Sequence, residues 1–252
     1  MGGTLSRLRS LIDTDGLAIG LGAVGLGVLG LISQDFAFQW QPVPKSWPAR
    51  EALAVLSGAV LLLGGAAVIV RRSTAVGAAV LAVWFGLFAI GLHLPLVIGA
   101  PGVGSLLGVA EQGAIALGAA LLFAVRAPGR LPGWSVPAAR VLFGLCAIEF
   151  GTAHFVYADF TAAMVPGWIP GHLFWAYATG ACHFAAGVAI LAGVQVRLAA
   201  GLLAVMCWGF ALLLHLPRVI GNPGSRMEWT MLFVALSIGG AAWVVRLVGR
   251  ER

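Results

Sequence analysis

Eight long apolar blocks limit what this chain can fold into. Each is close to the ~20 mostly apolar residues that span a bilayer. The blocks lie at about 16–33, 50–70, 74–98, 105–125, 138–158, 172–192, 197–217 and 228–247. Only 10% of the 252 residues are charged, against about 25% in a soluble domain. The pattern predicts an all-α membrane protein with eight transmembrane helices, whose first partner is the lipid bilayer. Because no clear cleavage site follows, we interpret the first block as a span and not as a signal peptide.

Basic residues are unevenly divided between the two sides that eight spans define. The side of the two termini holds eleven arginines: Arg7, Arg9, Arg71, Arg72, Arg126, Arg130, Arg140, Arg197, Arg246, Arg250 and Arg252. The other side holds Lys45, Arg50, Arg218 and Arg226. Since cytoplasmic loops carry the excess of Lys and Arg, we expect both termini in the cytoplasm. The net charge of +6 then reflects topology and indicates no nucleic-acid partner.

One ten-residue motif, which we call the repeated phrase, occurs twice in the sequence. The sequence HLPLVIGAPG at 93–102 recurs as HLPRVIGNPG at 215–224, an offset of 122 residues. At the same offset, VPKSWP at 43–48 aligns with VPGWIP at 165–170. We infer two four-helix units, at 1–125 and 141–252, joined by a cytoplasmic linker at 126–140. An even number of spans in each unit makes the two repeats parallel. Pro95 and Pro217 are expected to bend or end their helices.

The second half also carries a family resemblance. Its motifs are VPGWIPGHLFWAYATGACHFAAGVAILAG at 165–193 and HLPRVIGNPGSRMEWT at 215–230. On these residues it resembles the DoxX-like family of small four-helix bacterial membrane proteins. The resemblance implies the fold, a place in the bacterial cytoplasmic (inner) membrane, and a redox-associated role, since the family is named after a subunit of a thiosulfate:quinone oxidoreductase. It assigns no catalytic residue, so it leaves open whether the chain is an enzyme. A tandem pair departs from the family's single-unit pattern.

Ionisable residues gather in the spans of the second half. Glu149, His154 and His183 have apolar residues or glycine at the aligned first-half positions; Leu61, for instance, aligns with His183. A charged side chain at mid-bilayer costs ~2.5–3.5 kcal/mol and marks a functional candidate. Glu149 is such a group, with His183 as its first candidate partner. The candidate pocket comprises Glu149, His154, His172, Trp175, Thr179, His183, Trp208, His215 and Arg218.

Helical spacing favours a common face for some of these side chains. His172 and His183 are eleven residues apart, nearly three turns, and share a face. His154 lies about 140° around the helix from Glu149, so the two do not point squarely into one site. The depths of these groups suggest a polar funnel that opens outward from the second unit. The alternative is an interfacial aromatic belt with histidines bonded to neighbouring helices.

Three kinds of function stay open at this point. A quinone-linked, redox-associated membrane subunit would use His and Glu for proton exchange, aromatic walls for the quinone ring, and a redox partner protein. A proton-coupled transporter or exporter, or a lipid-binding scaffold without catalysis, would fit duplicated units around Glu149. A metal or haem site is disfavoured because HxxxH, ExxH and CxxCH are absent from the sequence. We expect any chemistry in the second half, with His93 mainly structural.

Overall fold

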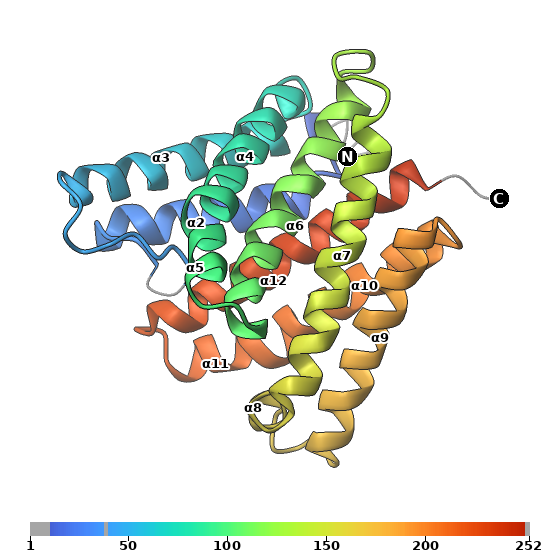
Figure 1. Cartoon of the computed structure of the whole chain (residues 1–252). Coiled ribbons are helices and arrows are strands. Elements are labelled where there is room, and N and C mark those ends of the chain that lie inside the picture. Colours follow the sequence, from blue (N-terminus) through green and yellow to red (C-terminus); the bar gives the residue numbers. More distant parts are fainter. Residues whose placement is uncertain (1–10, 38–39, 250–252) are drawn as a thin grey trace, which may run out of the picture.

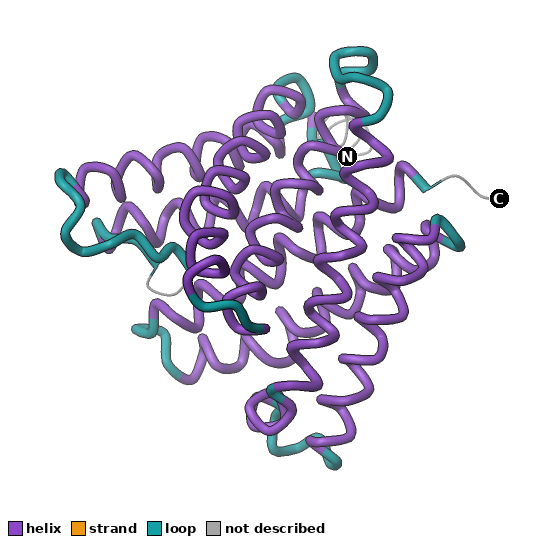
Figure 2. Tube along the Cα trace, viewed as in Figure 1, coloured by secondary structure: helices purple, strands orange, loops and turns teal. Residues whose placement is uncertain are grey.

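A computed structural model describes residues 11–37 and 40–249. Arg7, Arg9, Arg250 and Arg252 therefore lie outside the described residues. The described chain is helical, without a β-strand and with one isolated bridge between Ile12 and Val70 (Figure 2). The first half holds α2 (Leu17–Ser33), α3 (Arg50–Ile69), α4 (Thr74–Phe88), the π-helix η1 (Ala89–His93), α5 (Leu94–Gly99) and α6 (Val103–Arg126). The second half holds α7 (Ser135–Val156), α8 (Ala158–Met164), α9 (His172–Ala192), α10 (Val196–Phe210), the π-helix η2 (Ala211–His215), α11 (Leu216–Gly221), α12 (Arg226–Val245) and the 3₁₀-helix η3 (Arg246–Val248).

Seven helical segments of the described chain are long and apolar enough to cross a membrane. These segments are α3, α6, α7, α9 and the continuous runs Thr74–Gly99, Val196–Gly221 and Arg226–Val248. The sequence prediction of an all-helical, multi-pass membrane protein is thereby confirmed. The remaining expected span, at 16–33, corresponds to α2, which is apolar but only 17 residues long. A count of eight spans stays a prediction.

The repeated phrase has the same local structure in both halves. A five-residue π-helix ends at His93 and at His215, and a six-residue helix follows, with Pro95 or Pro217 as its second residue. Proline lacks an N–H and its ring clashes with the carbonyl four residues earlier. A π-turn holds one more residue than an α-turn and so accommodates the ring. The prolines therefore widen one turn, and the helical run continues beyond them instead of ending there.

Glycines allow the first two long helices of each half to touch backbone to backbone. The facing pairs are Gly20 with Gly65, Gly27 with Gly58, Gly144 with Gly187 and Gly151 with Gly180. A Cβ atom at Gly27 would lie 2.7 Å from the carbonyl oxygen of Gly58, and one at Gly151 would lie 2.8 Å from that of Gly180. Small residues at such contacts are how membrane helices pack closely. The two halves thus use the same device for their first helix pair.

The two halves pack against each other through their first and last long helices. Helix α12 contacts α2 and α6, and α6 contacts α7, so α6 and α12 occupy the middle of the molecule (Figure 1). Helices α3 and α4 lie to one side, and α9 and α10 lie to the other (Figure 1). One hydrophobic core runs through both halves, from Ile19 and Leu81 to Leu203 and Val244. The described parts of the two halves therefore share one hydrophobic core.

A partly buried ion-pair network closes one end of the molecule, where α2 begins and α6 ends. Arg126 donates from Nε to Oδ2 of Asp13 at 2.5 Å and from Nη2 to Asp15 at 2.7 Å. Asp13 also accepts the backbone N–H of Gly16 at the start of α2. Burial pushes the pKa of Asp13 upward, but the hydrogen bonds from Arg126 and Gly16 outweigh it, so this pKa lies below its ordinary value. The network fixes the start of α2 to the end of α6.

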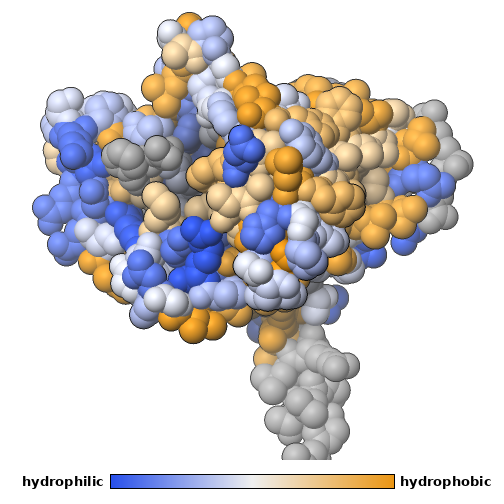
Figure 3. Space-filling view, turned by 90° about the horizontal axis from the view of Figure 1, so that it is seen from below, coloured by the Kyte–Doolittle hydropathy of each residue, from blue (hydrophilic) through white to orange (hydrophobic). Residues whose placement is uncertain are grey.

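The opposite end of the molecule carries α8, α11 and the connecting loop at 34–49. Seen from below, hydrophilic residues gather over part of this end, and hydrophobic residues cover the adjoining surface (Figure 3). Charged side chains here include Asp35, Arg50, Arg218 and Glu228, which form two ion pairs. A polar end beside an apolar flank is what a membrane-spanning protein presents at the bilayer surface.

Candidate functional site

Two of the predicted histidines meet in an aromatic cluster between α7, α9 and α10. The ring of His154 on α7 stacks on that of His183 on α9, with centroids 4.9 Å apart. Phe210, at the end of α10, stacks on His183 at 5.9 Å and on His154 at 6.2 Å. Phe150 meets His183 edge-on at 5.7 Å. We call these four residues the histidine cluster.

Each imidazole of the histidine cluster is oriented by its own helix. Nδ1 of His154 lies 2.8 Å from the carbonyl oxygen of Phe150, and Nδ1 of His183 lies 3.3 Å from that of Thr179. A carbonyl oxygen only accepts, so Nδ1 is the protonated nitrogen in both neutral rings. In each ring Nε2 is then the proton acceptor. Each neutral ring can therefore accept a hydrogen bond at Nε2.

Glu149 lies on α7 but outside the histidine cluster. Its Oε1 atom is buried and has no hydrogen-bond partner among the described residues. The imidazole of His183, its expected partner, contacts His154, Phe150 and Phe210 instead. The separation of Glu149 from His154 follows from their five-residue spacing on one helix. Glu149 remains a buried carboxyl group with unmet hydrogen-bonding capacity inside a spanning helix.

His215 and Arg218 lie apart from the cluster, at the α8 and α11 end of the molecule. Arg218 donates from Nε to both carboxylate oxygens of Glu228 at 3.1 Å. His215 is buried, and its Nδ1 has no partner among the described residues. The matching His93 is placed differently: its Nε2 lies 3.1 Å from the carbonyl oxygen of Trp40, to which Gln112 also donates at 2.7 Å.

The remaining predicted residues do not join these groups. Trp175 is 44% exposed and donates from Nε1 to the carbonyl oxygen of Pro170, while Thr179 bonds the carbonyl of Trp175 on its own helix. His172 is half-buried at the start of α9. Trp208 packs toward α12, with its ring 5.5 Å from that of Trp243. The structure thus distributes the nine predicted residues over several places and does not gather them into one funnel.

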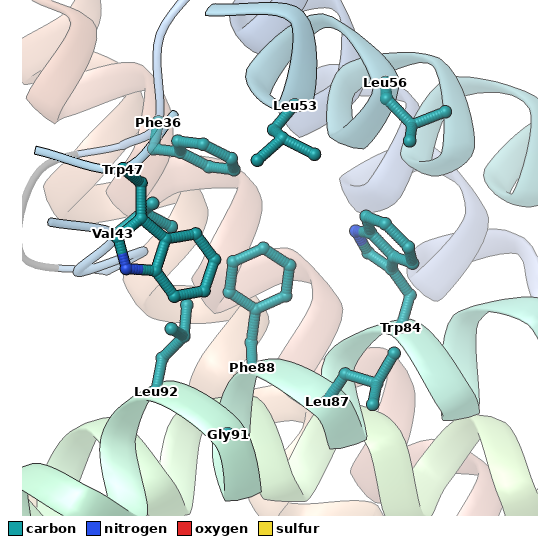
Figure 4. A pocket seen from close by; sticks show the side chains of 10 residues that line it. All are labelled: Phe36, Val43, Trp47, Leu53, Leu56, Trp84, Leu87, Phe88, Gly91 and Leu92. Carbon is teal, nitrogen blue, oxygen red and sulfur yellow. The ribbon is translucent and has the colours of Figure 1, made fainter. Parts of the chain in front are cut away.

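An apolar pocket lies in the first half, where no site was predicted. Its volume is about 220 Å³, and it opens between the 34–49 loop, α3 and the α4–η1 run (Figure 4). It is lined by Phe36, Val43, Trp47, Leu53, Leu56, Trp84, Leu87, Phe88, Gly91 and Leu92. We call this the first-half pocket. The search for ionisable groups missed it, although the density of aromatic residues at 36–47 and 84–88 was a visible signal.

Aromatic rings form the back of the first-half pocket. Phe88 packs against Phe36 at 6.2 Å and against Trp84 at 6.0 Å. Nε1 of Trp84 donates to the hydroxyl of Ser57 at 3.2 Å, which satisfies its polar atom. Leu56 and Leu87 are more than half exposed, so the pocket opens onto the apolar outer surface of α3 and α4. It has room for an apolar group.

The described residues do not form a cluster of metal ligands. In the part of the chain that the structure describes, no three His, Cys, Asp or Glu side chains converge as ligands would. The two stacked imidazoles present their faces to each other, whereas a shared metal requires both nitrogens to point at one ion.

Fold and surface together define a multi-pass helical membrane protein. Residues 136–216 match the model of the DoxX family. The match runs from α7 to the start of α11 and includes the histidine cluster, Glu149 and His215. It confirms the resemblance of the second half to DoxX-like proteins. Comparisons with curated proteins and with solved structures gave no match.

Proposed function

We propose that the protein binds a long-chain membrane amphiphile and acts as a lipid-binding membrane protein. The first-half pocket carries the proposal. Its lining is apolar, so the part of a ligand inside it is apolar as well. Its volume of about 220 Å³ is below the ~300–1,000 Å³ of pockets that enclose whole small molecules. It therefore takes one segment of a chain while the rest of the ligand stays in the bilayer.

Filling the pocket tests this function. Gly91 lines the pocket, and a Cβ atom added there meets no other atom within 4 Å. Gly91→Leu is therefore expected to occupy the pocket without disturbing the backbone. Gly86→Leu is the matched control, because Gly86 also faces open space but does not line the pocket.

The measurement is native mass spectrometry of protein released gently from detergent. Wild-type protein and Gly86→Leu are expected to retain a lipid, and Gly91→Leu is expected to lose most of it. Equal retention by all three proteins would rule out the first-half pocket as the lipid site.

The histidine cluster favours a second candidate, a quinone-linked, redox-associated membrane subunit. Two Nε2 acceptors, held by His154 and His183 on neighbouring spanning helices, are the groups that would exchange protons with a quinol or a redox partner protein. His183→Phe keeps the ring stack but removes the acceptor, and Glu149→Gln removes the other buried proton carrier. If this candidate is right, wild-type protein retains a quinone and these variants lose quinol-dependent proton exchange. Purification from quinone-containing membranes with no quinone bound would count against it and leave the lipid proposal standing.

We further propose a tandem duplication with eight spans and both termini in the cytoplasm of a bacterial inner membrane. The match of η1 to η2 at an offset of 122 residues and the shared glycine pairs support the duplication. The excess of arginines on one side supports the orientation. In a cysteine-free variant, an impermeant maleimide should label Lys45→Cys on intact cells but Ser6→Cys and Gly129→Cys only after lysis. Labelling of Ser6→Cys on intact cells would show that α2 does not span.

A further inference from the structure

Arg50 forms part of the rim of the first-half pocket. Its guanidinium lies 5.4 Å from the ring centroid of Phe36, and its Nε donates to the carbonyl oxygen of Val43 at 3.4 Å. Both Phe36 and Val43 line the pocket. Nη1 of Arg50 pairs with Asp35, while its Nη2 has no hydrogen-bond partner among the described residues. One edge of this guanidinium is therefore available to a ligand.

Arg226 approaches the same loop from the other half of the molecule. It donates from Nη1 to the carbonyl oxygen of Phe36 at 3.1 Å and from Nη2 to that of Asp35 at 2.5 Å. These acceptors are neutral, and residues 11–37 and 40–249 offer Arg226 no ion pair. Its Nε is buried without a partner. The loop wall of the pocket is thus held by a cation whose charge is not neutralised by direct pairing.

The charged groups that contact this loop leave one positive charge unpaired. Arg50 is paired with Asp35, whereas Arg226 is bonded only to neutral carbonyl oxygens. An uncompensated positive charge beside an apolar slot attracts an amphiphile whose head is negative. Guanidinium groups match the geometry of phosphate oxygens.

We infer that the ligand of the first-half pocket is a phosphate-bearing anionic lipid, with its chain in the pocket and its headgroup at Arg50 and Arg226. The inference rests on the proposed function and names its ligand class. Phosphatidylglycerol and phosphatidylcholine with identical acyl chains distinguish the anionic-headgroup inference from the lipid-binding proposal. Both lipids can fill an apolar pocket, but only phosphatidylglycerol has a net negative charge. The protein is equilibrated with equal amounts of both lipids in mixed micelles, and the retained lipid is measured by native mass spectrometry.

Wild-type protein is expected to retain phosphatidylglycerol in preference to phosphatidylcholine. One Lys or Arg near an anionic headgroup contributes about fivefold in affinity, so Arg50→Gln should reduce the preference about fivefold. Arg50→Lys keeps the charge and should keep most of the preference. Arg72→Gln removes the same charge from the other end of the molecule and serves as the matched control. Because Arg226 also holds the loop, Arg226→Lys is preferred to Arg226→Gln, and the melting temperature of every variant is recorded.

The possible outcomes test the anionic-headgroup inference and the lipid-binding proposal separately. Equal retention of the two lipids by wild-type protein, with both lost in Gly91→Leu, would overturn the anionic headgroup and leave the lipid pocket intact. An unchanged preference in folded Arg50→Gln would overturn the role of Arg50. Retention that Gly91→Leu does not affect would remove the proposed function itself.

Discussion

The two halves share their helices but differ in what lies beside the second and third long helices. Phe88 and Phe210 stand 122 residues apart at the ends of α4 and α10. In the first half, Phe88 forms the back of an open pocket. In the second half, Phe210 stacks on His183 and His154 and belongs to a packed cluster. One backbone scheme therefore supports an apolar opening in one half and a filled, polar interior in the other.

A few substitutions account for this difference. His183 stands where the first half has Leu61, and His172 begins α9 where Arg50 begins α3. The glycine pairs that set the distance between helices are kept in both halves. The helix contacts are thus a shared scaffold, and the side chains beside them can diverge without altering it. Predictions that treat the scaffold and the interior separately test this reading.

The scaffold prediction has the largest expected effect. Gly27→Val and Gly151→Val each place a branched side chain less than 3 Å from the backbone of the neighbouring helix. Backbone cannot move aside as a side chain does, so each variant should lose about 3 kcal/mol of stability, the upper end of the usual cost of overpacking. The two losses should be similar, as measured by unfolding in detergent. A marked difference between them would show that the helix pairs are not equivalent.

The second prediction concerns the helix interiors, where His183 of the second half aligns with Leu61 of the first half. His183→Leu removes the contacts of the imidazole with His154, Phe150 and Phe210, each worth about 0.5–1.5 kcal/mol. Leu61→His places an imidazole at a site that is 2% exposed and costs about 1–3 kcal/mol if the ring finds no partner. Leu61→Met and His183→Phe are the size-matched controls and should cost less. Stability that is unaffected by either exchange would mean that the interiors are interchangeable.

Much of the scaffold could be predicted from the sequence, and most of the site could not. The apolar blocks and the repeated phrase located the long helices, because twenty apolar residues have few alternatives to a membrane helix. Helix periodicity predicted different directions for Glu149 and His154, because both lie on one helix. It could not place His183, whose partners come from α7 and α10, since contacts between helices depend on rotation and crossing angles that no single helix encodes. The first-half pocket was not predicted because, in the sequence, its apolar lining residues look the same as residues of the hydrophobic core.

Replacing the two histidines of the repeated phrase should change protein stability to different extents, although the local fold around them is the same. His93→Ala leaves the carbonyl of Trp40 with Gln112 alone and empties the space over Gly108, where the ring now lies. Nδ1 of His215 has no hydrogen-bond partner among the described residues, so replacing His215 removes fewer stabilising contacts than replacing His93. His93→Ala should be about 1 kcal/mol more destabilising than His215→Ala in thermal unfolding. If His215 binds a quinone in the second half, His215→Ala should lose more quinone than His93→Ala. Equal effects of the two variants in both assays would indicate that the two copies work alike.

The smallest effect at neutral pH comes from the end of the molecule where Asp13, Asp15 and Arg126 of the first half form an ion-pair network. The pKa of Asp13 lies below its ordinary value because hydrogen bonds from Arg126 and Gly16 outweigh the effect of burial. A lowered pKa in the folded state means that the folded protein binds this proton less readily than the unfolded chain. The stabilisation by Asp13 is therefore fully present above the unfolded pKa of about 4 and is lost as the pH falls through the folded value.

Unfolding measured between neutral pH and about pH 3 should accordingly show an acid-sensitive loss that is smaller in Asp13→Asn, with the variant's deficit greatest at neutral pH. Arg140→Gln is the second-half control. Arg140 donates to the carbonyl oxygen of Ile190, an acceptor that does not titrate, so its contribution should be independent of pH over this range. Identical acid profiles for wild-type protein and Asp13→Asn would show that the network does not hold α2 to α6.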